Sequence, residues 1–181
     1  GSRMHYNFPR IGGVKRDLPY GFAQRARAKL DLFKQRIQEY ESLFDESTVF
    51  LVRTQGVGYT KAEEMVNHGV TGPNVRAAGV DYDVRWAHPY SVYSELDWAP
   101  AVERSSVKGA DCYDRYRVRV TEMVESANMV LEAIDRIPGG SETHHEPGDP
   151  AILAKAPSRA PEGTFGSHHF EDSRGESMFH L

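Results

Sequence analysis

The sequence predicts a mainly α-helical fold with small β pieces, and three observations support this prediction. Two segments, at about residues 20–44 and 111–137, repeat apolar residues with alternating spacings of three and four. This spacing places the apolar side chains in one stripe along an α-helix. The segments with strand-like composition are short, and the region between the two helices is rich in turn-forming residues. We therefore expect two long helices to organise the core.

The composition is that of a globular protein and excludes several classes. Of the 181 residues, 39% are hydrophobic and 27% are charged, which is typical of a packed domain rather than a disordered or fibrous chain. The longest stretch without a charged residue, Met65 to Val75, is too short to span a bilayer. We also expect no secretory signal, because no apolar core follows a charged amino-terminal region. Cys112 is the only cysteine, which excludes an intrachain disulfide and a cysteine-based cluster held by this chain alone.

The net charge of −4 conceals a gradient along the chain. Residues 1–40 hold nine bases and three acids, residues 41–140 hold ten and sixteen, and residues 141–181 hold three and seven. A basic end can attract nucleic acid or anionic lipid. Here the bases are spread around a predicted helix, so we interpret them as a solvated helix face and expect no nucleic-acid partner.

The first long helix is predicted from about residue 20 to residue 44. Pro19 suits a first helical turn, and Asp17 just before it is expected to face the helix amides. The pair Gly12-Gly13 upstream would allow a close approach of the backbone to another element or a ligand. The apolar stripe consists of Ala26, Leu30, Phe33, Ile37, Tyr40 and Phe44.

The region between the helices contains three recognisable patterns. Val49-Phe50-Leu51-Val52 is predicted as a short strand or a buried segment. Thr60-Lys61-Ala62-Glu63 predicts a capping box that opens a short helix ending at Gly69. Residues 71–93 combine glycines, prolines and three tyrosines, and we interpret them as a loop buried between domains or subunits. Within it, His88 precedes a proline and is expected to be a hydrogen-bonded loop residue rather than a ligand.

The second long helix is predicted from about residue 111 to residue 137, where Pro138-Gly139-Gly140 stops it. Asp111 and Asp114 suit its positive amino-terminal end. Ion pairs are expected from Asp111 to Arg115 and from Asp114 to Arg117, because these spacings bring side chains together on a helix.

The chain is predicted to form one incomplete domain with three parts. Residues 1–140 make up the helical core, residues 141–164 a linker-like loop, and residues 165–181 the start of a small β region. In this last part, two strand-like pieces flank Ser173-Arg174-Gly175.

Candidate metal and nucleotide sites are weak. The pairs His144-His145 and His168-His169 lack helical spacing, and adjacent histidines in a strand point to opposite faces. Cys112 at a helix start allows a reactive thiol, although a lone cysteine is more often a small buried residue. Gly56-Val57-Gly58 lacks the rest of a phosphate-binding loop. We therefore predict no metal site and no bound nucleotide on this chain.

Taken together and in this order, the clusters resemble the D-type subunit of NADH-quinone oxidoreductase, the respiratory complex I. The resemblance implies an internal fragment of a longer subunit, with a fold shared in part with the large subunit of nickel-iron hydrogenases. The matching stretches are Gly1–Asn7, Gly12–Pro19, Thr71–Asn74, Arg76–Ala77, Tyr82–Arg85, His88–Tyr93, Asp111–Tyr116, Glu122–Met123 and Arg174–Glu176.

The resemblance implies reduction of a quinone, ubiquinone or menaquinone, by electrons from an iron–sulfur subunit, coupled to proton translocation. Other peripheral-arm subunits of a hetero-oligomeric membrane complex would hold NAD, FMN and the clusters, on the cytoplasmic side of the membrane. Asp17 matches the aspartate thought to hydrogen-bond a quinone-binding histidine upstream of Gly1, and Gly12 and Gly13 would lie near the quinone cavity. The fragment by itself would be inactive.

Two alternatives stay open at this point. The chain could come from the large subunit of a membrane-bound nickel-iron hydrogenase, whose four metal-binding cysteines lie in pairs near the chain ends. It could also be a non-catalytic assembly module that docks partners and touches no substrate.

Overall fold

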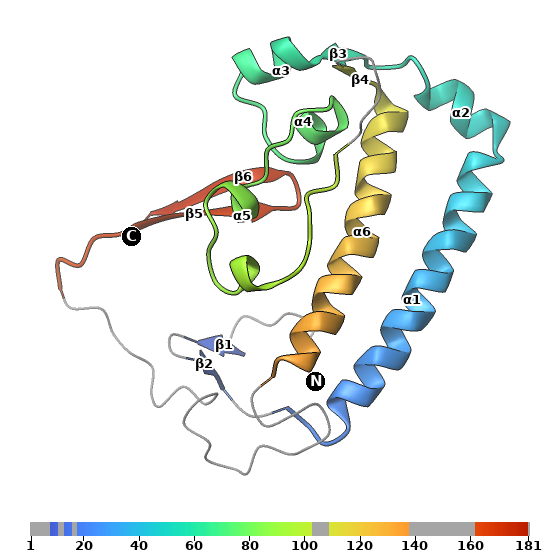
Figure 1. The fold of residues 1–181 in the computed structure, drawn as a ribbon. Helices are drawn as coiled ribbons and strands as arrows, with labels where there is room; N and C mark the ends of the chain where they lie inside the picture. Colours follow the sequence, from blue (N-terminus) through green and yellow to red (C-terminus); the bar gives the residue numbers. More distant parts are fainter. Residues whose placement is uncertain (1–7, 11–12, 16–17, 103–108, 138–161, 181) are drawn as a thin grey trace.

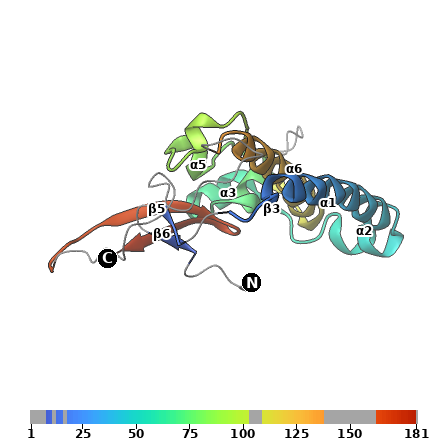
Figure 2. The same cartoon turned by 90° about the horizontal axis from the view of Figure 1, so that it is seen from below.

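Two long helices lie side by side and form the frame of the molecule. The computed structural model describes residues 8–10, 13–15, 18–102, 109–137 and 162–180. Helix α1 (Phe22–Asp45) and helix α6 (Cys112–Asp135) are 24 residues long each, and they run alongside one another in both views (Figures 1 and 2). Some of the shorter elements also contact α6. The predicted class, mainly α with small β pieces, is confirmed.

Short helices and two-stranded sheets fill the rest of the described chain. The three sheets are all antiparallel hairpins or strand pairs. The helices are α2 (Thr48–Thr54), α3 (Ala62–Asn67), α4 (Pro73–Ala77), α5 (Val84–Ala87) and the 3-10 turn η1 (Tyr93–Glu95). The strand pairs are β1 (Pro9–Arg10) with β2 (Gly13–Val14), β3 (Thr60–Lys61) with β4 (Gly109–Ala110), and β5 (Ser167–Asp172) with β6 (Gly175–His180).

Helix α1 begins later than its sequence pattern suggests. Its N-cap is Gly21 in the left-handed conformation (φ 65°), and the N–H of Phe22 donates to the Pro19 carbonyl at 3.0 Å. Pro19 therefore lies in the turn before the helix, and the expectation of Pro19 in the first helical turn was wrong. Asp17, which was expected to face the helix amides, lies outside the described residues. A glycine adopts this conformation without strain, so the chain changes direction there and sets the start of α1.

Helix α2 occupies the segment predicted as a strand or a buried segment, and that prediction was wrong. Ser47 caps α2 by accepting from the N–H of Phe50 at 3.4 Å, while Val49 and Val52 are 70% and 72% exposed. A short apolar run cannot distinguish strand from helix by periodicity. Phe50 turns inward, and its ring centroid lies 5.1 Å from those of both Phe44 and Tyr116.

Helix α3 exists as predicted but lacks the predicted capping box. Thr60 pairs with Ala110 across β3 and β4 instead of capping, and Lys61 is an N-cap without a side-chain hydrogen bond. The helix ends at Asn67, shortly before Gly69 (φ 67°). Pairing with a strand 50 residues away therefore overrides the local cap signal.

The core lies where α3, α4 and α6 meet. Many of its members are small, which allows these elements to approach closely. The segment interpreted as a loop between domains or subunits instead passes through this chain's own core, and parts of it form α4 and α5. The buried cluster contains Ala62, Met65, Val75, Ala77, Ala78, Ala101, Ala110 and Val118.

Helix α6 starts with a complete capping box. Asp111 Oδ1 accepts from the N–H of Asp114, and Asp114 Oδ2 accepts from the N–H of Asp111, at 3.0 and 2.9 Å. Asp111 Oδ2 also accepts from the N–H of Gly56 at 2.7 Å. The arginines expected to pair with these acids bind elsewhere: Arg115 donates to backbone carbonyls, and Arg117 to Glu41 and Asp45 of α1.

We expect Asp111→Ala to lower the free energy of unfolding by about 1–2 kcal/mol, the usual cost of losing a helix N-cap. Burial favours a raised pKa for Asp111, but the backbone N–H groups of Gly56, Asp114 and Tyr113 outweigh it and lower the pKa. Its contribution is therefore present above the ordinary aspartate pKa and lost as pH falls through the lowered value. Urea unfolding across pH should show the two proteins converging in acid, whereas Asp31→Ala on exposed α1 should change little.

Large apolar side chains stay exposed along α1 and α2. They include Tyr40, Leu43, Val49 and Val52. In the part of the chain that the structure describes, no helix combines the length and apolar character needed to cross a bilayer. Most of the predicted linker at 141–164 lies outside the described residues, while the two expected strand-like pieces are β5 and β6, on either side of Ser173 and Arg174.

Candidate functional site

The residues proposed from the sequence for a quinone site fall at the edge of the described chain. Asp17 and Gly12 lie outside the described residues. Gly13 opens β2 and pairs with Arg10 of β1 in an antiparallel register, and the N–H of Lys15 donates to the Phe8 carbonyl at 2.8 Å. A tight β hairpin therefore precedes the start of α1.

The two adjacent histidines of β5 have different neighbours, as expected for residues that alternate across a strand. His168 packs its ring 5.2 Å from Tyr90, while His169 Nδ1 lies 2.6 Å from Glu176 Oε1. His144 and His145 lie outside the described residues. Among the residues that are described, no group of three or more His, Cys, Asp or Glu side chains is arranged to hold a metal.

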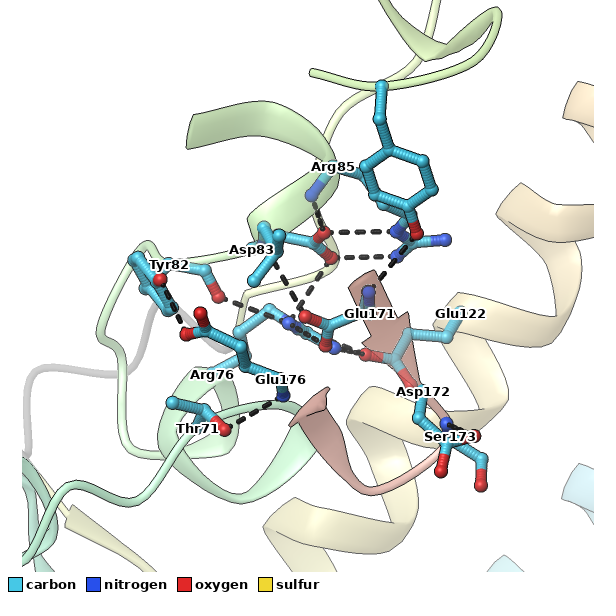
Figure 3. A network of polar contacts seen from close by, with 12 residues as sticks. Thr71, Arg76, Tyr82, Asp83, Arg85, Glu122, Glu171, Asp172, Ser173 and Glu176 are labelled. Carbon is cyan, nitrogen blue, oxygen red and sulfur yellow. Dashed lines mark hydrogen bonds and ion pairs between the residues drawn. The ribbon is translucent and has the colours of Figure 1, made fainter. Parts of the chain in front are cut away.

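The most prominent polar feature is a buried network centred on Arg76 of α4 (Figure 3). Arg76 is 1% exposed. Its Nε and Nη2 donate to Glu122 Oε1 of α6 at 3.0 and 2.7 Å, and its Nη1 donates to Glu171 Oε1 of β5 at 2.9 Å. The same Nη1 donates to the Tyr82 carbonyl and lies 3.2 Å from Asp83 Oδ2. One guanidinium thus joins α4, α6 and the β5–β6 hairpin.

Asp83 has a second and closer cationic partner. Arg85 donates to it through Nε and Nη2, at 2.9 and 2.7 Å, in the two-pronged geometry that suits a carboxylate. The Arg85 guanidinium also lies over the Trp98 ring at 4.6 Å and the Tyr93 ring at 5.6 Å, distances at which a cation is attracted to an aromatic face. Asp83 is therefore fixed between two arginines.

The β5–β6 hairpin also contributes a carboxylate, that of Glu176, next to Glu171. Glu171 and Glu176 are partners in the register of β5 and β6, so their side chains lie on the same face. Tyr82 donates its hydroxyl to Glu176 Oε2 at 2.8 Å. Hydrogen bonds to His169, which has the larger effect, and to Tyr82 lower the pKa of Glu176. Burial and the hydrogen bond to this carboxylate raise the pKa of Tyr82 to about 12.

A cavity of about 1050 Å³ lies next to this network. Apolar side chains from α1 and α6 line one part of it, among them Phe33, Met123 and Val130. Arg76 and Glu171 line another part. The hydroxyl of Tyr116, which also lines the cavity, has no hydrogen-bond partner among the described residues. The cavity can therefore receive an apolar group beside charged ones.

Sequence reasoning missed the Arg76 network. Its two arginines and its aspartate stand in residues 71–93, the segment that was interpreted as an interface loop. The available signal was the presence of charged residues inside a segment whose other residues look buried. Buried charges are almost always paired, so this pattern indicates an internal ion-pair network.

Comparison with known proteins gives a family match over nearly the whole chain. The family model described as "Respiratory-chain NADH dehydrogenase, 49 Kd subunit" matches residues 1–177. A D-type subunit of the NADH-quinone oxidoreductase of Rhizobium etli is 46% identical over 140 residues, 77% of this chain and 34% of that protein. An H-type subunit of the NAD(P)H-quinone oxidoreductase of Gloeobacter violaceus is 42% identical over 140 residues, 77% of this chain and 35% of that protein.

The coverage values also show how much of each relative this chain matches. The chain spans about a third of the length of these curated relatives. Among solved structures, a chain of the membrane-bound sulfane sulfur reductase, described as an archaeal respiratory membrane complex, matches with a TM-score of 0.75 and 28% identity. That match covers 94% of this chain and 44% of the other.

Proposed function

We propose that this chain, which belongs to the family of the respiratory-chain NADH dehydrogenase 49 Kd subunit, forms part of the quinone-reducing subunit of a complex I-type NADH-quinone oxidoreductase. The family match over residues 1–177 carries the proposal. The names of the relatives, which include D-type subunits of NADH-quinone oxidoreductases, favour this function over that of a hydrogenase large subunit.

In the proposed reaction, electrons from an iron–sulfur subunit convert a quinone to a quinol. Each quinone takes up two electrons and two protons, so proton donors must stand beside its two oxygens. We assign Asp17 a positioning role: its carboxylate would hold a quinone-binding histidine in the orientation and protonation state that proton donation requires. Gly12 and Gly13 would let the backbone approach the quinone closely.

The proposed partners are an iron–sulfur subunit and other peripheral-arm subunits of a proton-translocating membrane complex, with this chain peripheral to the membrane on its cytoplasmic side. Exposed apolar side chains on α1 and α2, such as Leu43, Val49 and Val52, support an interface there. Helices α1 and α2 contact each other, and large apolar side chains exposed on neighbouring elements are typical of a subunit that packs against other subunits. NAD, FMN and the clusters would reach the reaction only through those neighbours.

We expect Asp17→Asn in the intact complex to slow quinone reduction by roughly tenfold or more, because misplaced proton donors commonly cost at least that much. Electron entry from the donor, measured with an artificial acceptor that takes electrons upstream of the quinone, should stay unchanged. The pH profile of quinone reduction should shift as well, because the asparagine can no longer hold a positive charge on the histidine.

The matched control for this experiment is Asp31→Asn, which removes a carboxylate from an exposed position on α1. It should leave both the rate and the pH profile as they are. Equal quinone reduction by the Asp17 variant and the unmodified complex would remove Asp17 from the mechanism.

A further inference from the structure

The β5–β6 hairpin is attached to the rest of the chain chiefly by polar contacts. The N–H of Glu176 donates to Thr71 Oγ1 at 2.9 Å, and the N–H of Glu171 donates to the Tyr90 hydroxyl at 3.1 Å. The turn end of the hairpin lies close to the backbone at Gly72. Large apolar residues at the other end of β6, Met178 and Phe179, are exposed. Attachment therefore depends on the groups around Glu171 rather than on a broad apolar contact.

The buried network contains more negative than positive charge. Two arginines, Arg76 and Arg85, face three carboxylates, Asp83, Glu122 and Glu171. The side chains of Arg76, Asp83 and Glu171 are only 2%, 0% and 4% exposed. The side chains of Arg85 and Glu122 are 16% and 21% exposed. With every group ionised, the network would therefore carry one unbalanced negative charge that is mostly shielded from water, which is unfavourable.

Glu171 is the carboxylate least compensated by these arginines. Glu122 accepts two hydrogen bonds from Arg76, and Asp83 accepts the two-pronged bond from Arg85. Among the described residues, Glu171 accepts from Nη1 of Arg76, which is shared with Asp83, and, over a long distance of 3.4 Å, from the N–H of Val84.

The surroundings of Glu171 oppose its charge further. Burial raises its pKa and the nearby Asp83 adds to this, although Arg76 and the Val84 N–H act in the other direction. Glu176 stands directly opposite it in the hairpin, and like charges in facing positions destabilise a strand pair. Other described titratable groups near the two glutamates are Tyr82 and His169, which bind Glu176, and Tyr90, whose hydroxyl accepts from the N–H of Glu171. His88 lowers the pKa of Glu176 by its electrostatic interaction with it.

We propose that the Glu171 carboxyl is a proton-binding site while the hairpin is docked on α4 and α5, and that loss of this proton to solvent at higher pH loosens the docking. The network then acts as a proton-sensitive latch. Because the docked state favours the protonated form, the stabilisation is fully present below the ordinary pKa of a glutamate and is lost as pH rises through the higher value of the docked state. This inference does not depend on the proposed function.

The test is amide hydrogen exchange of β5 and β6 in the full chain as a function of pH, corrected for the intrinsic exchange rate. We expect protection of the hairpin to fall as pH rises, by roughly tenfold for each unit by which docking raises the pKa. Glu171→Gln, which mimics the protonated carboxyl, should keep the protection of the acidic protein at every pH. Asp172→Asn, the exposed neighbour on the same strand, should behave like the unmodified chain.

Protection that is lost in Glu171→Gln at all pH values would overturn the proposal, because it would mean that the ionised carboxylate supports docking. A second measurement decides the matter should this variant fail to fold. Carbon-13 NMR titration of the unmodified chain should give a midpoint for the Glu171 carboxyl above that of solvent-exposed glutamates. A midpoint at or below theirs would equally contradict the latch.

Discussion

Replacing Arg76 by methionine should destabilise the chain by about 3–5 kcal/mol, the range expected when one partner of a buried ion-pair network is removed. In the part of the chain that the structure describes, the substitution leaves buried Asp83 and Glu171 and partly buried Glu122 with Arg85 as their remaining arginine partner. Methionine fills similar space, so the loss reports on charge and hydrogen bonding rather than on a cavity. Urea unfolding followed by tryptophan fluorescence measures it, since Trp98 lies against Arg85.

Two further substitutions separate charge from geometry in this experiment. Arg76→Lys keeps the positive charge but cannot reproduce the three directions in which the guanidinium donates, so we expect an intermediate loss. Arg36→Met removes an exposed arginine paired with Glu39 on α1 and should leave stability unchanged. A loss for Arg76→Met no greater than that for Arg36→Met would show that the network does not stabilise the fold.

The long helices were predictable because their signal is local. The apolar stripe indicates a helix at about residues 20–44, and α1 spans Phe22–Asp45. The second stripe indicates about 111–137, and α6 spans Cys112–Asp135. Side chains three and four residues apart share a helix face whatever the rest of the chain does, so the pattern needs no tertiary information.

The Arg76 network could not be predicted in the same way. The partners that Arg76 binds, Glu122 and Glu171, are 46 and 95 residues away in sequence, and no local pattern relates them. The same limitation explains the error at Thr60, whose strand partner Ala110 lies far along the chain. Local signals were also incomplete at residues 49–52, where the apolar run fits both a strand and the helix that forms.

The Asp17 assignment depends on the resemblance to the D-type subunit of complex I rather than on any of these patterns. From spacing alone Asp17 was expected to face the first helix, and it lies outside the described residues. The site therefore stands on family membership together with a test in the intact complex.

The second large effect is expected from Gly72→Ala, at about 3 kcal/mol or more. Gly72 has φ +76°, where a side chain is strained, and an added Cβ would lie 2.3 Å from Cα and 2.6 Å from N of Gly175. Strained backbone costs on the order of 1–3 kcal/mol, and forcing an atom into packed backbone adds a similar amount. Because the obstruction is the backbone of the hairpin itself, β5 and β6 should move away from α4.

Gly69→Ala is the control for Gly72→Ala, because Gly69 also has a positive φ (+67°) but, among the described residues, has no atom within 4 Å of the added Cβ. It should cost only the strain, about 1 kcal/mol. The difference between the two variants in urea unfolding then measures the close approach of α4 and the hairpin, and hydrogen exchange should show lost protection in β5 and β6 for Gly72→Ala alone. Equal losses in the two variants would mean that Gly72 and Gly175 are not in contact. The proton-sensitive latch would then lack the close packing that holds the Glu171 carboxyl against Arg76.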